Sequence, residues 1–462
     1  MRRYPKNLLI FLAFFIVFFK IIPEILEVWG PLEIKYDSNI FIYSAYYYPN
    51  SKSLGENAIA INMVIDQNAF DKPEKLKIHI IGENSTTFDN FEGRIQIDGI
   101  QVCSLITTVL LTNTLPNLET LKIQSGSQEI EIPFRSPKFT SPSPVIICIS
   151  PQFVAEQWQL FLFHIHVIRK FKGHAHFYIT SIVDTYFEMV SKYEELGWIT
   201  IDFWNRIDFG DESEPMRNVE WRNQAGAQTD CLLQYKEVAD YIAFFDLDDI
   251  LIPESHPTYI QEFTHEFSLY PEDQKSYLFY ERQVHKMKDM RRKFDFTNLL
   301  LEKHIEVNMG KSVIRPEKFN STWIHFSWNV DFEKGINVKS HFMKHVKIVE
   351  NVSNAARKLK IAEKLQSGFE RIHKNLSLHK MPTNFYFNLI RTCYNEIYYK
   401  TGFIQGKLNS KCLNPESCDY PQVKRIKCVH SDAKYEHGPK MGRFTFHWIE
   451  KQFWNRTYGC YP

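Results

Sequence analysis

Alternation of apolar and polar residues dominates the first part of the chain after its apolar N-terminus. KLKIHI, GRIQIDG and ETLKIQSGSQEIEIPF each repeat with a period of two, which predicts β-strands, and the SGS of the third string is typical of a hairpin turn. The following string, PFRSPKFTSPSP, is rich in proline and serine, as in a linker. We therefore expect a small β-rich domain over residues 31–134 and a linker over residues 135–144.

From Val145 onwards, short apolar strands alternate with helical patterns. VIICIS, AHFYIT and WITIDFW are predicted strands, separated by two predicted helices. A longer helix is expected over about residues 216–236, before the apolar strand Tyr241–Phe245. Strands that alternate with helices predict an α/β fold with a mostly parallel sheet flanked by helices, which we assign to residues 145–380.

Residues 381–462 are expected to form a cysteine-rich extension packed on this domain. The chain has eight cysteines, an even number that favours disulfides in an oxidising compartment. They are Cys103, Cys148, Cys231, Cys393, Cys412, Cys418, Cys428 and Cys460. Their spacing does not fix the pairing. The alternative is a zinc site formed by Cys412, Cys418, Cys428 and His430, although it lacks a CxxC pair.

The first thirty residues have the pattern of a membrane-targeting segment. Three basic residues precede an uninterrupted apolar run from Leu8 to Phe19, and no small residues follow it as a cleavage site would require. We expect a cytosolic tail over residues 1–7 and an uncleaved transmembrane anchor over residues 8–28. The positive charge before the span predicts a single-pass type II protein whose remaining chain is lumenal.

Five Asn-x-Ser/Thr sites follow the span, as expected of a chain that is glycosylated in the secretory pathway. They are Asn84, Asn320, Asn351, Asn375 and Asn455. Together with the anchor and the cysteines, these sites predict a protein of the Golgi membrane.

The composition excludes several classes of protein. The 462 residues include 55 Lys and Arg against 54 Asp and Glu, so the formal net charge is only +1, which argues against a protein that coats nucleic acid. Hydrophobic residues make up 44% of the chain and charged residues 24%, values that exclude a disordered chain, a collagen and a multi-span membrane protein.

An acidic cluster, Asp246, Asp248 and Asp249, follows directly after the strand Tyr241–Phe245. Ligands of open α/β sheets bind at the carboxyl ends of the strands, and carboxylate oxygens suit Mg²⁺ or Mn²⁺. A divalent ion held there can bridge the phosphates of a substrate. A solvated turn is the plain alternative, but the apolar residues on both sides favour the metal site.

The string FDLDDIL also resembles the nucleophile loop of haloacid-dehalogenase-type phosphatases. In that interpretation Asp246 attacks phosphorus and Asp248 acts as acid and base. Three features disagree: Ile250 stands where Thr or Val is expected, no second acidic pair follows, and strand-helix units precede a loop that normally opens its domain. The phosphatase stays as an alternative.

Nucleotide-sugar glycosyltransferases of the GT-A type carry an Asp-x-Asp after an apolar strand, midway through one α/β domain. More specifically, the region from Val145 to about Ile348 resembles glycosyltransferase family 92, a group abundant in nematodes and also found in plants. The matching residues are Cys148 and Pro151 in CISP, Trp158, Gly173 with the following HFYIT, Gln228, Asp230 and Cys231 in QTDCLLQY, the string FFDLDDILIP, the string GKSVIRPEKF, and His325. The family more often has Glu at the position of Asp249, a difference that keeps the charge.

The resemblance implies a GT-A-like fold and a metal-dependent transfer that inverts the anomeric centre. UDP-galactose is the donor that the family suggests, the acceptor is a glycan, for which we expect an N-glycan, and Mn²⁺ or Mg²⁺ is the expected cofactor. The usual direct ligand in this class is the second Asp of the triplet, here Asp248, whereas Asp246 suits the ribose or a metal-bound water. We expect His325 as a further metal ligand, with His341 and His345 as other candidates.

Two more residues are assigned roles as hypotheses. Arg222 lies before the strand that leads to the acidic cluster and can bind a phosphate of the donor, with a surface salt bridge as the plainer alternative. Glu281, at the end of the strand SYLFYE, is our candidate for the base that takes the acceptor's proton. A catalytically inactive, membrane-anchored glycan-binding protein is the remaining alternative.

Overall fold

The computed structural model describes residues 37–71, 77–98, 102–271, 273–291, 293–373, 380–393, 403–404, 407–408, 412, 414 and 423–461. The chain divides into two compact units, Met1–Asp37 and Ser38–Pro462, and the second contains all the elements below. The predicted tail and anchor lie outside the described residues. Among the described helices, none is both long and apolar enough to cross a bilayer.

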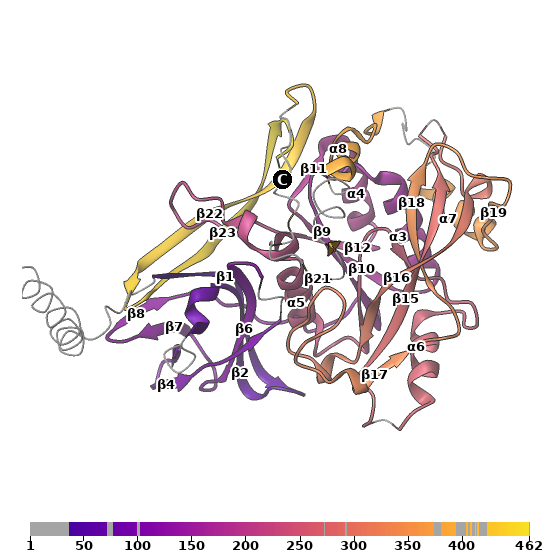
Figure 1. Cartoon of the computed structure of the whole chain (residues 1–462). Helices are drawn as coiled ribbons and strands as arrows, with labels where there is room; N and C mark the ends of the chain where they lie inside the picture. The colour runs from indigo at the N-terminus through magenta and orange to yellow at the C-terminus, as the bar shows by residue number, and fades with distance from the viewer. Residues whose placement is uncertain are drawn as a thin grey trace, which may run out of the picture. The chain divides into compact units, whose positions relative to one another are not determined.

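A ten-stranded mixed sheet forms the framework of the α/β part (Figure 1). Its main path runs β12 (Ile199–Phe203), β10 (His174–Ile179), β9 (Val145–Gln152), β13 (Tyr241–Phe245), β16 (Leu300–Ile314), β15 (Tyr277–Lys288), β18 (Met343–Val349) and β14 (Asp249–Ile250), while β17 (Gly335–Asn337) and β19 (Arg357–Lys358) pair at its side. The first four strands are parallel, whereas β16 is antiparallel to its two neighbours. The predicted α/β class is confirmed, but the sheet is parallel only over part of its width.

Helices cover both faces of this sheet because its central strands are apolar on both sides. On β9, Val145, Ile147 and Ile149 pack into the core that holds α3 and α4. The alternate residues Ile146 and Cys148 pack into a second core with α5. The helices are α3 (Trp158–Lys170), α4 (Asp184–Glu195), α5 (Gln224–Tyr235), α6 (Tyr259–Ser268), α7 (Ala362–Ile372) and α8 (Phe385–Cys393).

The strands of the predicted β-rich region lie in two sheets, one antiparallel and one mixed, and the mixed sheet also includes strands from elsewhere in the chain. The smaller has the order β4 (Phe88–Glu92), β3 (His79–Glu83), β7 (Thr120–Ser125) and β8 (Gln128–Glu131), and the β7–β8 hairpin confirms the predicted turn, with Gly126 at a φ of 65°. The larger has the order β11 (Ser181–Val183), β22 (Lys427–Met441), β23 (Phe444–Tyr458), β1 (Ser38–Ser51), β2 (Gly55–Asp66), β6 (Leu105–Asn113) and β5 (Arg94–Ile97).

The C-terminal segment therefore does more than pack on the α/β domain. Its hairpin β22–β23 pairs with β11 at one side and runs parallel to β1 at the other, as the yellow hairpin beside the indigo strand in Figure 1 shows. Residues about 400 positions apart thus share a sheet, for example Ile40 and Phe446. The first and last parts of the described chain fold together.

Helix α5 is shorter than predicted and is buried all round. It begins at Gln224 and not near Met216, because Trp221, Arg222 and Asn223 all have positive φ angles, between 45° and 58°, which no α-helix accommodates. The Asn223 side chain then accepts a hydrogen bond from Gly226 N and caps the helix. One face packs on the mixed sheet, while Leu233 packs among residues of β1, β2 and β6.

Asp230, on this buried helix, has a carboxylate satisfied from several elements. It accepts hydrogen bonds from Ser44 (2.5 Å), Tyr46 (2.8 Å), Tyr178 (2.7 Å) and Arg135 (2.9 Å). Burial alone would raise the pKa of Asp230, but Arg135 and these hydroxyls hold it below its usual value. Arg135 belongs to the predicted linker, so this segment is tied into the interior.

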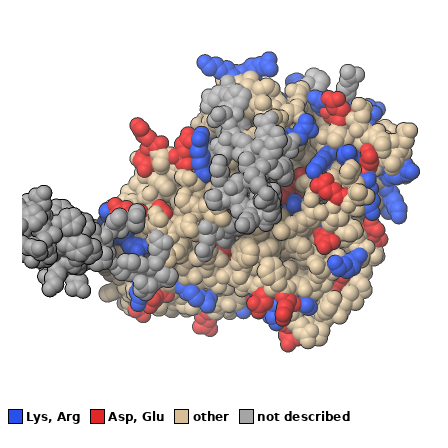
Figure 2. All heavy atoms as spheres, in the orientation of Figure 1, with Lys and Arg blue, Asp and Glu red and all other residues tan. Residues whose placement is uncertain are grey.

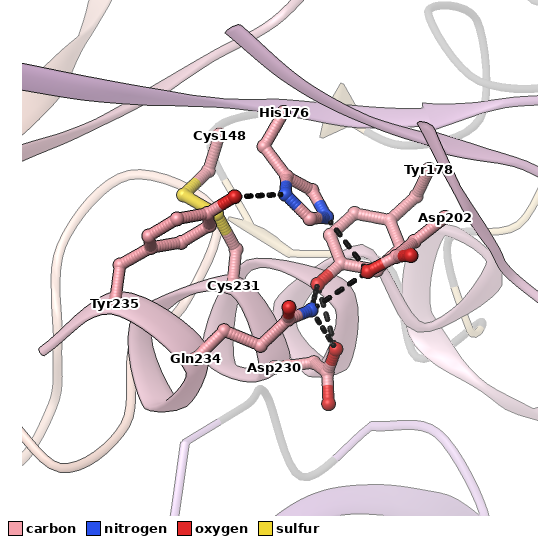
Figure 3. Close-up of a disulfide and its surroundings, with 8 residues drawn as sticks. All are labelled: Cys148, His176, Tyr178, Asp202, Asp230, Cys231, Gln234 and Tyr235. Carbon is pink, nitrogen blue, oxygen red and sulfur yellow. Dashed lines mark hydrogen bonds and ion pairs between the residues drawn. A yellow bond between two sulfur atoms is a disulfide. The ribbon is translucent and has the colours of Figure 1, made fainter. Parts of the chain in front are cut away.

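Figure 3 shows how this network continues beside a disulfide. Gln234, one turn along α5, donates to Asp230 (3.1 Å) and to Asp202 (2.8 Å), and His176 lies 3.2 Å from the same Asp202 carboxylate. The Cys148–Cys231 disulfide joins β9 to α5 next to these groups.

The described disulfides are Cys103–Cys412, Cys148–Cys231 and Cys428–Cys460, and Cys393 is disulfide-bonded as well. The zinc alternative is wrong, because two of its proposed ligands, Cys412 and Cys428, are in different disulfides.

On the face drawn in Figure 2, basic and acidic side chains are interspersed, in keeping with the near-zero net charge.

Five buried histidines have a pKa lowered by burial to between about 3 and 4. They are His164, His166, His174, His430 and His447. The unfolded chain protonates them near pH 6.5 while the folded protein keeps them neutral, so the unfolded state binds more protons and stability falls as the pH drops from about 6.5 towards 4. Asp98 and Glu156, whose pKa values burial raises to about 6 and about 7, oppose this trend but are fewer.

We expect the melting temperature to fall steadily between pH 7 and pH 5, measured by scanning calorimetry. Replacing His430 with Gln should flatten this slope, whereas the same change at the exposed His265 should leave it unaltered. A melting temperature that rises on acidification over this range would contradict the prediction.

Candidate active site

The acidic cluster lies where β13 leaves the mixed sheet. All five residues of β13 are buried, and the chain turns at once, with Asp249 N donating to Asp246 O (3.0 Å). Asp249 then starts β14, which pairs with β18, and Val346 N donates to Asp248 O (2.8 Å). Hydrogen bonds on both sides of the turn therefore hold the three carboxylates at the carboxyl end of a central strand.

His164 fixes this turn from helix α3. Its Nδ1 lies 3.0 Å from the carbonyl oxygen of Leu247, in the middle of the cluster. Burial lowers the pKa of His164 to about 4, so the ring is neutral at physiological pH and donates its proton to the carbonyl.

Asp246 is held by three side chains from three elements. Gln224, the first residue of α5, donates to Oδ1 (2.8 Å), and the ammonium of Lys311, on β16, lies 2.9 Å from Oδ2. Arg282, on β15, is 3.6 Å from the same oxygen. Lys311 is fully buried, so its charge depends on this carboxylate for compensation.

Asp249 is the most buried of the three carboxylates. Arg282 lies 3.2 Å from its Oδ2, and Nδ1 of His345, on β18, lies 2.9 Å from its Oδ1. Burial alone would raise the pKa of Asp249, but Arg282 and His345 hold it well below its usual range. Asp249 is therefore ionised at neutral pH.

Asp248 faces the opposite electrostatic situation. Burial and the neighbouring carboxylates of Asp249 and Asp246 raise its pKa, and only His345, 3.5 Å away, and Arg282 act against this. Burial would lower the pKa of His345, yet Asp248 and Asp249 raise it. Two carboxylates thus share one imidazole, an imbalance that a cation would relieve.

Asp248, Asp249 and His345 offer ligand atoms that all lie within 4.8 Å of one another. Carboxylate oxygen with imidazole nitrogen is a donor set that suits Mn²⁺ and related divalent ions. These residues fit a metal ion. Asp248 was predicted as a ligand and His345 was a further candidate, whereas Asp249 was placed in the acidic cluster without a role of its own.

The other predicted site residues lie around this cluster. Nδ1 of His325 is 2.8 Å from Gly310 O, and burial together with Lys311 and Arg282 lowers its pKa. In the described part of the chain His325 is not among the three grouped ligands, so its role as a ligand stays a prediction. Arg222 is buried, with its guanidinium 4.1 Å above the ring of Phe153, two residues before the Gln224 that reaches Asp246.

Glu281 lies beside Arg282, where the pairing of β15 and β16 shifts register. Gly310 fills the opposite position on β16, and a Cβ there would stand 2.1 Å from Tyr280 O, so only glycine permits this approach. Glu281 directly precedes Arg282, the residue that binds Asp249. Its role as base stays a prediction.

The sequence did not predict the contacts of Gln224, Arg282, Lys311 and His164 in this site. A signal existed for Lys311, because it directly precedes the uncharged run Ser312–Ile314 and a charge buried in a strand requires a partner. Arg282, between Glu281 and Gln283, carries no such signal. Gln224 and His164 carry no local signal, since helices distant in sequence bring them to the turn.

The family comparison agrees with this site. A family model described as glycosyltransferase family 92 matches residues 143–387, which include the mixed sheet and the acidic cluster. The chain belongs to glycosyltransferase family 92. It is accordingly a glycosyltransferase by family, and this membership replaces the phosphatase interpretation of FDLDDIL.

Relatives extend the similarity over nearly the whole chain. Glycosyltransferase family 92 protein ZK381.2 of Caenorhabditis elegans is 43% identical, over 92% of this chain and 90% of the relative. Family 92 protein F55C10.4 of the same organism is 35% identical over 92% and 90%. The similarity therefore includes the β-rich part as well as the α/β part.

Solved structures show only slight likeness. S. aureus TarS 1–349 in complex with UDP is 10% identical, with 44% of this chain and 60% of that chain covered and a TM-score of 0.25. The galactosyltransferase LgtC in complex with donor and acceptor sugar analogs is 12% identical, with 38% and 59% covered and a TM-score of 0.21. Likeness at this level does not identify a ligand.

We expect Lys311→Met to lower the free energy of unfolding by about 3 kcal/mol, because Asp246 would lose its nearest buried cation. Chemical denaturation measures the change, with Lys318→Met, an exposed lysine nearby in sequence, as the control. Adding Asp246→Asn to Lys311→Met should restore part of the loss. If it restores none, the two residues do not act as an ion pair.

Proposed function

We propose that this family 92 glycosyltransferase moves a sugar from a UDP-sugar to a hydroxyl group of a glycan, with inversion at the anomeric carbon and with a divalent ion bound at the acidic cluster. Galactose is the sugar and an N-glycan the acceptor that we propose, on the family resemblance. The observation that carries the proposal is the grouping of Asp248, Asp249 and His345 at the carboxyl end of β13.

In this proposal Asp248, Asp249 and His345 hold Mn²⁺ or Mg²⁺. When bound, such an ion acts as a Lewis acid that stabilises the negative charge on a departing diphosphate. The chain's own residues prepare the site. Lys311 and Gln224 orient Asp246, which we assign to the donor's ribose or a metal-bound water, and Arg282 keeps Asp249 ionised.

The transfer itself needs one proton acceptor. The acceptor's hydroxyl oxygen forms a bond to the anomeric carbon, the bond from that carbon to the UDP oxygen breaks, and the hydroxyl proton passes to a base. We propose Glu281 as the base, supported by its position next to Arg282. His325, beside Lys311 and Arg282, is proposed as a further metal ligand, and Arg222, near Gln224, is proposed to bind a phosphate of the donor.

We further propose that the protein works in the Golgi as a single-pass type II membrane protein. Support comes from the basic and apolar residues at the N-terminus and from the disulfides, which form in oxidising compartments. The second candidate function is glycan binding without catalysis, which would not require the acidic cluster.

Asp248→Ala should lower the rate of sugar transfer by about a thousandfold, because the ion would lose a central ligand. The measurement is UDP release coupled to a gain in glycan mass, with a panel of UDP-sugars, labelled N-glycans and Mn²⁺. EDTA should abolish the activity of the unchanged protein. Asp240→Ala is the matched control, because Asp240 is an exposed aspartate that directly precedes the same strand at its opposite end.

Two outcomes would contradict the proposal. Full activity of Asp248→Ala, or full activity in EDTA, would remove the metal site from the mechanism. A folded protein that turns over no UDP-sugar yet binds glycans without metal would favour the binding protein instead.

Among the predicted glycosylation sites in the described chain, Asn351 is the most accessible. Asn351 is exposed, whereas Asn84 and Asn455 are only partly exposed. The side-chain amides that would carry the glycan are also already bonded there, since Nδ2 of Asn84 donates to Pro116 O and Nδ2 of Asn455 donates to Asp432. We expect Asn351→Gln to lower the mass of the protein by one glycan when it is made in a eukaryotic cell, measured by gel mobility with and without a glycan-cleaving enzyme. Asn354→Gln, an exposed asparagine outside any such site, is the control, and equal mobility of both variants would contradict the prediction.

A further inference from the structure

A loop beside the acidic cluster carries an unusual concentration of aromatic side chains. The aromatic loop, residues 321–332, contains Trp323, Phe326, Trp328 and Phe332. Trp323 and Phe326 are buried and form the base of the group, whereas 49% of Trp328 and 62% of Phe332 are exposed. The rings contact one another, with centroids 4.8 Å apart for Phe326 and Trp328 and 4.7 Å apart for Phe326 and Phe332.

The aromatic loop is attached directly to the candidate active site. Lys311, which pairs with Asp246, also donates to the carbonyl oxygen of Ile324 (3.1 Å). His325 contacts Gly310 O in the bulge next to Glu281. The ring of Trp323 lies 5.3 Å from that of His325 and 5.5 Å from that of Trp328, so two ring contacts lead from the site to the exposed indole.

A carboxylate of the β-rich part holds the loop in place. Asp98, which follows β5 and is 1% exposed, accepts hydrogen bonds from Ser321 Oγ (2.8 Å), Ser327 Oγ (2.7 Å) and Trp328 N (2.9 Å). Asn329 Nδ2 adds a longer contact of 3.3 Å. Four donors on one buried carboxylate fix the backbone of the loop. The main chain at Trp328 is therefore anchored, while its side chain is half-exposed.

The dimensions and charge of the exposed surface indicate the kind of occupant. Two half-exposed rings offer roughly 250 Å² of apolar surface, far below the ~800 Å² that each partner of a stable protein interface buries. Asp331 and Glu333 flank Phe332, and acidic neighbours disfavour an anionic membrane surface. A pyranose ring, with C–H groups on one face and hydroxyls at its edge, matches a small aromatic surface with polar neighbours.

We infer that the aromatic loop binds a saccharide of the glycan acceptor, with Trp328 and Phe332 stacking on a sugar ring and Asp98 acting as a positioning residue. This inference rests on the proposed function for its assignment to the acceptor. It gives the β-rich part a role in acceptor binding, because Asp98 sets the position of the loop from outside the α/β part.

The test uses the whole lumenal chain, a UDP-sugar that the protein turns over, and a pool of fluorescently labelled N-glycans. Trp328→Ala and Phe332→Ala should each raise the apparent KM for the pool tenfold or more, while hydrolysis of the donor by water keeps its rate and its donor KM. Trp328→Tyr should stay within about threefold of the unchanged protein, because it keeps a ring. Phe88→Ala, which removes an exposed aromatic from β4, is the matched control.

Asp98→Asn and Ser327→Ala test the positioning role. Asp98→Asn should raise the apparent KM for the glycan pool with little change in donor hydrolysis, and Ser327→Ala, which removes one donor only, should give a smaller shift in the same direction. If Asp98→Asn fails to fold, Ser327→Ala alone still distinguishes the two outcomes. Equal loss of transfer and of donor hydrolysis would overturn the positioning role.

Equilibrium binding of the labelled pool without donor separates this inference from the proposed function. If the unchanged protein transfers sugar and Trp328→Ala keeps the KM and affinity for the pool, the inference is wrong and the proposed function stands. If no UDP-sugar is turned over but binding of the pool falls tenfold in Trp328→Ala, the proposed function is wrong and the loop is still a saccharide site. Loss of donor hydrolysis in Trp328→Ala would assign the loop to the donor and overturn the inference.

Discussion

The buried carboxylate of Asp230 and its partners connect the two halves of this protein. Helix α5 is enclosed between the mixed sheet and the sheet that contains β1, so a charge on it has no access to bulk water. Arg135 supplies the opposite charge, and hydroxyl groups from both sheets complete the hydrogen bonds. Because removing one partner would leave a buried charge uncompensated, the β-rich part, the connecting segment and the α/β part depend on one another.

This dependence reaches the acidic cluster by two routes. Helix α5 begins at Gln224, directly after three consecutive residues with positive φ, which are strained. The side chain of Gln224 contacts Asp246. From the other side, Asp98 holds the loop whose Ile324 carbonyl accepts a hydrogen bond from Lys311. Residues outside the mixed sheet thus fix the side chains at its edge, which is consistent with relatives that match along the whole chain rather than the α/β part alone.

Local sequence patterns predicted the strands and the acidic cluster, because these features depend on residues that are close together in the chain. β9 and β13 are continuous apolar runs because both of their faces are buried, and the acidic cluster stands out for the same reason, as charge directly after an apolar strand. The pairing of β1 with β23 has no such signal, since it joins segments about 400 residues apart. The start of α5 was placed too early because Trp221 and Arg222 are not residue types that favour a left-handed backbone, although Asn223 is. The contacts of Gln224 and His164 likewise arise from packing between elements and not from spacing.

The balance of charge at the cluster gives a physical reason for the cation that we propose there. Asp246, Asp248 and Asp249 bring three negative charges close together, and Lys311 and Arg282 supply two positive ones. Both cations lie against Asp246 or Asp249, so in the described chain Asp248 forms its ion pair with His345, and Asp249 shares that imidazole. With a neutral His345 the group carries one net negative charge, which a divalent ion would convert to one net positive charge. Under the proposed function, the ion would therefore bind before the diphosphate, because without it the carboxylate of Asp248 would repel the phosphates.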